Sequence, residues 1–315
     1  MFGVVRIFIN LKRFEVPRSQ GGICPSDDPY RWIRSIIRAA TVIKIPAAID
    51  LHLIYLLPEG LIFPALKALK GKKSESSIHV SVGSQGVHWQ DIARGGNFGA
   101  FTSMLPARAA RNLGCSWAMV GHSEERQAKL ELLAMYNPDI VLKDEAAKRA
   151  RAAVNRAIGL EVECALQAGL NVLLCVGESE QEKGQGYFEE QKPRIQAVLR
   201  EQLSVNLSCV RTIPGEGRIV IGYEPLWAIG PGKIPPAPEY IGFVSSCIKE
   251  AVQELFGFNP PVVYGGGLKE ENAGMIAGIK TIDGGLVALT RFSGEIGHEP
   301  EGFRCIIDRY LESIL

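Results

Sequence analysis

The sequence predicts a closed (β/α)8 barrel, an α/β fold, from two observations. The chain contains short runs that are almost continuously apolar, as parallel strands covered by helices on both faces should be. These runs are residues 4–10, 49–57, 77–83, 117–122, 171–177, 218–224, 261–266 and 284–289. Longer amphipathic stretches separate them, so a strand-then-helix unit repeats along the 315 residues, as it does around a barrel. An open doubly wound sheet is the alternative architecture.

The clearest helical stretches are residues 147–169, 182–203 and 237–256. The first is rich in Ala, Arg, Leu and Glu and ends at a glycine, which is a helix stop signal. No low-complexity linker and no near-identical repeat divides the chain. We therefore expect residues 1–315 to form one barrel domain.

Two segments are longer than the connections that a barrel core needs. Residues 129–149 follow the fourth strand, and residues 292–302 follow the eighth. Insertions in loops cost little because the entropy of loop closure rises slowly with length. We interpret both segments as insertions in βα loops, at the end of the barrel where active sites are built.

Composition excludes several classes of protein. Hydrophobic residues make up 46% and charged residues 22% of the chain, which indicates a globular rather than a disordered protein. The net charge of +1 gives no support for a nucleic-acid surface. No apolar run reaches the roughly 20 residues of a membrane span, and the first residues lack a signal-peptide pattern. We expect a cytoplasmic protein that binds neither nucleic acid nor membranes.

The seven cysteines include no C-x-x-C pair. Neither a zinc site nor a redox pair is therefore indicated, and the wide spacing is typical of reduced thiols in a cytosolic protein. We expect no metal and no cofactor.

The segment IGYEPLWAIGPGK, residues 221–233, is the strongest indication of a functional site. An apolar strand ends at Glu224, Pro225 fixes the exit, and glycines around residue 231 form a tip. A lid of this kind can present a backbone N–H group to an anion and expel water. Loss of water raises the basicity of a nearby carboxylate. The alternative is a strand-end glutamate in a structural salt bridge.

Two further strand ends carry polar residues. His122 ends the fourth strand and precedes a predicted helix, whose N-terminus favours a neutral imidazole that can donate to a carbonyl. Asn10 and Lys12 end the first strand, and residues two apart on a strand point to the same side. Taken alone, His122 could equally be a structural histidine, and Lys12 could be a solvated surface lysine.

The segment YGGGL, residues 264–268, follows the seventh strand. Consecutive glycines let backbone N–H groups converge on a phosphate. Barrels commonly bind phosphate in this loop, although a triple glycine alone is only a flexible turn.

Together, these segments closely resemble the triosephosphate isomerase family. The matching segments are NLK (10–12), GAFT (99–102), GHSEER (121–126), CVGE (175–178), YEPLWAIGPGK (223–233), YGGGL (264–268) and DGGLV (283–287). They occur in the family's order and cover almost the whole chain outside the two long segments. The resemblance implies a TIM barrel and an isomerase that interconverts an aldose phosphate and a ketose phosphate through an enediolate.

The resemblance also implies roles for five residues. Glu224 removes a proton from one carbon of the substrate and returns it to the next. His122 donates a hydrogen bond to the enediolate, Lys12 supplies positive charge, and Asn10 helps to seat the substrate. Glu124 supports the site from behind.

For the phosphate, the resemblance implies N–H groups from Gly230 in the lid and from the turn at Gly266 and Gly267. The family is usually a homodimer in which the loop after strand three reaches into the partner's site. Thr102 matches the contacting position, which predicts a homodimer here. The preceding loop, GSQGVHWQD at residues 83–91, departs from the family's pattern.

The departures from the family's pattern concentrate on phosphate binding. Gly267 stands where the family has a serine, and Ala288 and Leu289 replace paired glycines that let the backbone approach the phosphate. The longer loop that follows brings in Arg291, which can form a charge-assisted fork with phosphate or lie on the surface. Pro231 is a milder change that stiffens the tip of the lid.

Three functions follow as alternatives. The first is the interconversion of glyceraldehyde 3-phosphate and dihydroxyacetone phosphate. The second is the same chemistry on another sugar phosphate, such as a tetrulose phosphate. The third is a non-catalytic barrel with a binding or regulatory role, against which the joint presence of Lys12, His122 and Glu224 argues.

Overall fold

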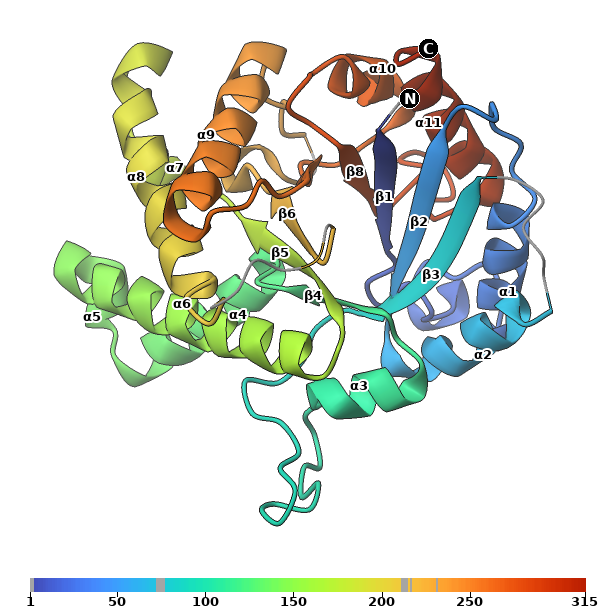
Figure 1. The fold of residues 1–315 in the computed structure, drawn as a ribbon, viewed down its shortest axis with the longest axis horizontal. Helices are drawn as coiled ribbons and strands as arrows, with labels where there is room; N and C mark the ends of the chain where they lie inside the picture. Colours follow the sequence, from blue (N-terminus) through green and yellow to red (C-terminus); the bar gives the residue numbers. More distant parts are fainter. Residues whose placement is uncertain (1–2, 72–76, 211–214, 216, 231) are drawn as a thin grey trace.

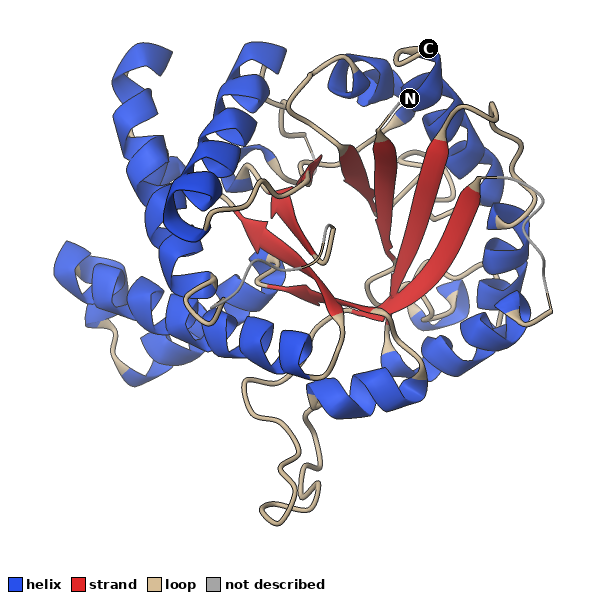
Figure 2. Cartoon of the chain, viewed as in Figure 1, coloured by secondary structure: helices blue, strands red, loops and turns tan. Residues whose placement is uncertain are grey.

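A computed structural model describes residues 3–71, 77–210, 215, 217–230 and 232–315. Eight parallel strands close into a barrel in sequence order, and the last pairs with the first (Figures 1 and 2). They are β1 (Val4–Asn10), β2 (Asp50–Leu57), β3 (Ile78–Ser84), β4 (Trp117–Val120), β5 (Asn171–Val176), β6 (Ile219–Tyr223), β7 (Val262–Tyr264) and β8 (Gly284–Val287). The predicted (β/α)8 TIM barrel is confirmed, and the open sheet is excluded.

The predicted strands run one or two residues too far at the carboxyl ends of β4 to β8. His122 and Glu224 are predicted as the last residues of their strands but lie just beyond the strand pairing. Both belong to the loops that line the mouth of the barrel.

Helices surround the barrel on its outside (Figure 2). They are α1 (Pro29–Ala40), α2 (Glu59–Leu69), α3 (Ala107–Leu113), α4 (Ser123–Tyr136), α5 (Asp139–Leu142), α6 (Asp144–Gln167), α7 (Glu180–Lys183), α8 (Phe188–Asn206), α9 (Pro238–Phe256), α10 (Glu270–Ala277) and α11 (Pro300–Glu312). Short 3-10 helices span Arg18–Gln20 and Leu226–Ala228. Within the described ranges, none of the helices has the length and apolarity required to cross a bilayer.

Two predicted segments differ in detail from the structure. The stretch 182–203 is two helices rather than one, because α7 ends at Lys183 and is followed by Gly184, whose φ of 73° breaks the helix. The insertion at residues 129–149 is helical and comprises the end of α4, all of α5 and the start of α6.

The core has two layers that follow from the alternation of side chains along each strand. Side chains facing the barrel axis fill its interior: Phe8, Ile54, Leu56, Trp117, Met119, Leu173, Cys175, Val220, Val263 and Leu286. A larger layer lies between the strands and the helices. On β1, Phe8 points inward and so does Asn10, which is buried at the carboxyl end. The alternation therefore places Asn10 at the mouth of the barrel.

The connection between β3 and α3, residues 85–106, extends away from the barrel (Figure 1). It carries Phe98, whose side chain is 87% exposed. This loop is the most protruding part of the chain on that side.

Candidate active site

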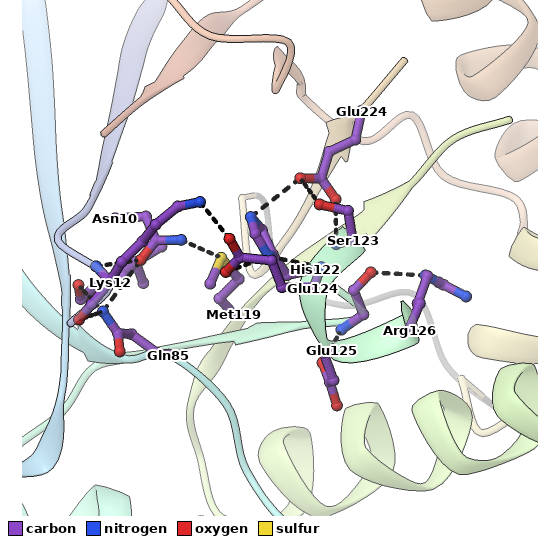
Figure 3. A network of polar contacts seen from close by, with 12 residues as sticks. Asn10, Lys12, Gln85, Met119, His122, Ser123, Glu124, Glu125, Arg126 and Glu224 are labelled. Carbon is purple, nitrogen blue, oxygen red and sulfur yellow. Dashed lines mark hydrogen bonds and ion pairs between the residues drawn. The ribbon is translucent and has the colours of Figure 1, made fainter. Parts of the chain in front are cut away.

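The carboxyl ends of β4 and β6 bring His122 and Glu224 into direct contact (Figure 3). His122 Nε2 lies 3.2 Å from Glu224 Oε1, and both side chains are almost completely buried. The two residues that the sequence placed at one mouth of the barrel therefore share one small site.

Glycines on the two neighbouring strands create the space that holds Glu224. A Cβ atom at Gly177, after β5, would lie 1.8 Å from the Glu224 carbonyl oxygen. A Cβ atom at Gly265, after β7, would lie 2.8 Å from Glu224 Cγ. Both distances are too short for a side chain, so only glycine allows the strand ends to enclose Glu224 this closely.

Burial makes Glu224 a stronger base than an exposed glutamate. Desolvation raises the pKa of its carboxyl group, while His122 and the hydrogen bonds from Ser123 partly oppose the shift. A carboxylate that is poorly solvated gains more by taking a proton. This environment suits a group that must abstract a proton from carbon.

Ser123 was not singled out in the sequence analysis, although it lies in the GHSEER segment. Its backbone N–H donates to Glu224 Oε2 at 2.9 Å, and its hydroxyl donates to Oε1 at 3.3 Å. His122 and Ser123 together therefore contact both oxygens of the Glu224 carboxylate.

His122 is the N-cap residue of α4, as the predicted helix start implied. Its Nδ1 atom accepts the backbone N–H of Glu124 at 3.3 Å. An acceptor at Nδ1 requires a free lone pair, so the ring proton sits on Nε2. The imidazole thus presents an N–H donor to the interior of the site.

Lys12 adopts a backbone conformation that is uncommon for lysine, with φ of 42°. Asn10 Oδ1 accepts the Lys12 N–H at 3.0 Å, and Gln85 donates both to Asn10 Oδ1 at 3.1 Å and to the Lys12 carbonyl at 2.9 Å. Lys12 Nζ lies 2.5 Å from Glu124 Oε1. These contacts hold the ammonium group on the same side of the barrel as His122 (Figure 3).

Gln85 is a second residue that the sequence analysis missed. It directly follows β3, so its position at a strand end was the available signal. Its three hydrogen bonds reach Asn10, Lys12 and the carbonyl of Leu56. Gln85 therefore positions the turn that carries the lysine.

Arg126 anchors the first turn of α4. Its guanidinium donates to the carbonyls of Gly121 at 2.7 Å and Cys175 at 2.9 Å. It also donates to the side chains of Asn155 at 2.7 Å and Asn206 at 2.9 Å. The helix that carries the histidine is thereby fixed to β5, α6 and α8.

The base of the predicted lid is attached to Glu178. One of its carboxylate oxygens accepts from Trp227 Nε1 at 2.8 Å, Tyr223 OH at 3.0 Å and Tyr240 OH at 2.8 Å. Burial raises the pKa of Glu178, and these three donors partly offset that rise. The first residues of the lid are therefore tied to the ends of β5 and β6.

The glycines expected to contact phosphate have the backbone shapes that require glycine. Gly230 has φ of 123° and Gly267 has φ of 89°. A Cβ atom at Gly266 would lie 2.2 Å from the Tyr264 hydroxyl. Pro231, at the tip of the lid, lies outside the described residues.

In the loop after β8, two of the residues expected to bind phosphate make contacts within the loop itself. The Ala288 carbonyl lies 2.9 Å from Nδ1 of the buried His298, a residue that the sequence analysis missed. Leu289 is only partly buried. Arg291 donates to Glu299 at 2.9 Å, so its guanidinium is engaged within its own loop. The structure therefore pairs Arg291 with Glu299.

Comparisons with known proteins place the chain in a family. The family model for triosephosphate isomerase matches residues 55–296. The chain is 34% identical over 236 residues to a triosephosphate isomerase of Prosthecochloris aestuarii, which covers 74% of this chain and 78% of that protein. It is 30% identical over 233 residues to an L-erythrulose-1-phosphate isomerase of Rhizobium etli, which covers 74% of this chain and 73% of that protein.

A crystal structure of triosephosphate isomerase from Bartonella henselae shows the same fold. Its TM-score is 0.65 at 20% identity, over 97% of this chain and 98% of that one. The chain is therefore an isomerase of the triosephosphate isomerase family.

Proposed function

We propose that this chain interconverts an aldose phosphate and a ketose phosphate by moving a proton between adjacent carbons through an enediolate. The observation that carries the proposal is the buried carboxylate of Glu224 beside the N–H donor of His122, 3.2 Å apart at the carboxyl end of the barrel.

Each step of the reaction has a side chain suited to it. Glu224 takes the proton from the carbon next to the carbonyl and later returns it to the former carbonyl carbon, while the hydroxyl proton on the first carbon passes to the former carbonyl oxygen. His122 donates its Nε2 proton in a hydrogen bond to the oxygen on which negative charge develops. Lys12 adds a positive charge that favours the anionic substrate and the enediolate. The Asn10 and Gln85 contacts hold Lys12 in place.

The first candidate substrate pair is glyceraldehyde 3-phosphate and dihydroxyacetone phosphate, because the proton-transfer residues match the family in full. The second candidate is a tetrulose phosphate, and two observations favour it. Ala288 and Leu289 stand where closely approaching glycines are expected, and one relative acts on L-erythrulose 1-phosphate by its name. A non-catalytic barrel is disfavoured by the assembled Lys12, His122 and Glu224.

A substrate panel tests the proposal. Purified wild-type protein is assayed with glyceraldehyde 3-phosphate and with tetrose and tetrulose phosphates, and kcat/KM is compared. A value for the triose phosphate near the diffusional ceiling of about 10⁸–10⁹ M⁻¹ s⁻¹ supports the first candidate and excludes an altered substrate. A preference for a tetrulose phosphate supports the second. No isomerisation of any member of the panel contradicts the proposal as a whole.

A homodimer is part of the proposal. The loop of residues 85–106 presents the exposed side chains of Phe98 and Thr102, and Gln85 and its neighbours line a cavity of about 310 Å³. The same loop of a second copy, seated in this cavity, would lie against the turn that holds Lys12. Sedimentation equilibrium is expected to show a dimer for the wild type and a monomer for Phe98→Asp. A monomeric wild type contradicts this part of the proposal.

We also propose the cytoplasm as the compartment. Among the described residues, Cys24, Cys115, Cys164, Cys175, Cys247 and Cys305 form no disulfide, as expected where thiols are kept reduced. Fractionation of cells that produce the chain tests this, and recovery outside the cytoplasm would contradict it.

A further inference from the structure

Asp50, His52 and His79 form a cluster at the amino end of the barrel, opposite to the proposed active site. Asp50 begins β2, and His52 follows two residues later on the same face. His79 lies in β3 directly beside His52 in the parallel register. Strand pairing therefore gathers three potential metal ligands that are not adjacent in the sequence.

The distances within this cluster suit ligands of one metal ion. Asp50 Oδ1 lies 3.3 Å from His52 Nε2 and 3.1 Å from His79 Nε2. The three ligand atoms all lie within 4.8 Å of one another. A tetrahedral ion with bonds of about 2.0–2.1 Å separates its ligand atoms by about 3.3–3.4 Å. The observed spacing is close to that value.

The alternative is that both imidazoles simply donate hydrogen bonds to Asp50. Within the described part of the chain, however, no donor satisfies hydrogen-bond geometry toward Asp50 Oδ1, although this atom is buried. Both ring nitrogens lie within 3.3 Å of this oxygen, but their angles to it fall outside the range of a full hydrogen bond. Nitrogens that point at a common ion beside the oxygen, rather than at the oxygen itself, would show this geometry.

We propose that Asp50, His52 and His79 bind one divalent transition-metal ion of the Zn²⁺ type. Two imidazoles and one carboxylate form a donor set that such ions prefer and that Mg²⁺ does not. The three side chains remain partly exposed, which leaves room for an ion to enter and for water as a further ligand. The ion would link the starts of β2 and β3 and so stabilise the floor of the barrel.

Zinc titration of untagged, chelator-treated protein tests the site. Calorimetry is expected to give one Zn²⁺ per chain, and the midpoint of thermal unfolding should rise with Zn²⁺ but not with Mg²⁺. His79→Ala and Asp50→Asn should each weaken Zn²⁺ binding at least about tenfold. Co²⁺ should give the visible absorption of a tetrahedral complex in the wild type and lose it in His79→Ala.

The matched control is His88→Ala, which removes a histidine that packs beside Trp89 in the loop after β3. This variant should bind Zn²⁺ as the wild type does. Wild-type protein that binds no Zn²⁺, or a His79→Ala variant that binds it as tightly as the wild type, overturns the proposal. Because the cluster lies far from Glu224, the isomerase kcat/KM of His79→Ala is expected to remain at the wild-type level, so this test is independent of the proposed function.

Discussion

Glu224→Gln is expected to lower kcat by about 10³-fold or more, while KM changes little. The amide keeps the shape of the side chain and can still contact Ser123, but it has no basic oxygen to accept a proton from carbon. The loss is large because burial raises the pKa of the Glu224 carboxyl group and makes it an effective base. Steady-state kinetics on the best substrate of the panel measure both constants.

The pH dependence of kcat/KM tests the role of Glu224 independently. Because the pKa of Glu224 is raised from its ordinary value of 4.5, kcat/KM of the wild type should fall with decreasing pH at a higher pH than an exposed glutamate would dictate. This decline of kcat/KM on the acidic side reports the pKa of the essential base in the free enzyme. A decline at or below the ordinary value would mean that Glu224 is not the base.

The control for Glu224→Gln is Glu180→Gln, at the start of α7 on the same end of the barrel. The Glu180 side chain is 59% exposed and pairs with Lys183, so its loss should leave kcat unchanged. Near-wild-type turnover in Glu224→Gln would remove the central residue of the proposed mechanism.

Arg126→Met is expected to lower the free energy of unfolding by about 2–3 kcal/mol. Methionine fills a similar volume but donates no hydrogen bond, so acceptors on Gly121, Cys175, Asn155 and Asn206 lose their partner. Buried acceptors without a donor are costly. Urea unfolding followed by circular dichroism gives the difference.

The control lies one residue further along α4. Gln127 is exposed and bonds only to Glu131 among the described contacts, so Gln127→Met should change the stability by less than about 0.5 kcal/mol. Arg126→Lys, which keeps the charge but loses the fork, should fall between the two. Equal stabilities for Arg126→Met and Gln127→Met would show that the buried fork contributes nothing to stability.

The barrel could be predicted from the sequence because its strands are buried on both faces and so appear as continuous apolar runs. The predicted strands extend too far at their carboxyl ends, because the residues that follow an apolar run, such as Gly177, do not reveal in the sequence where the pairing stops. The break at Gly184 was missed because a single glycine within a long amphipathic stretch is not decisive.

The site could be located from polar residues at strand ends, and Lys12, His122 and Glu224 indeed lie at one end of the barrel. The partners of these residues could not be predicted in the same way. Ser123 and Glu224 are 101 residues apart in the sequence, and their hydrogen bonds depend on how β4 and β6 are placed in the closed barrel. The contact of His52 with His79 likewise depends on the register of β2 and β3.

The enclosure of Glu224 by Gly177 and Gly265 limits how this enzyme can acquire new substrates. Any larger residue at either position would displace Glu224 itself, so substitutions of these two glycines are expected to abolish activity rather than to change the substrate. The loops after β8 and β3 carry no such restriction and can change length and chemistry while the base stays in place. A shift in substrate preference should therefore be sought first at Leu289 and its neighbours, where the chain already departs from its relatives' expected pattern.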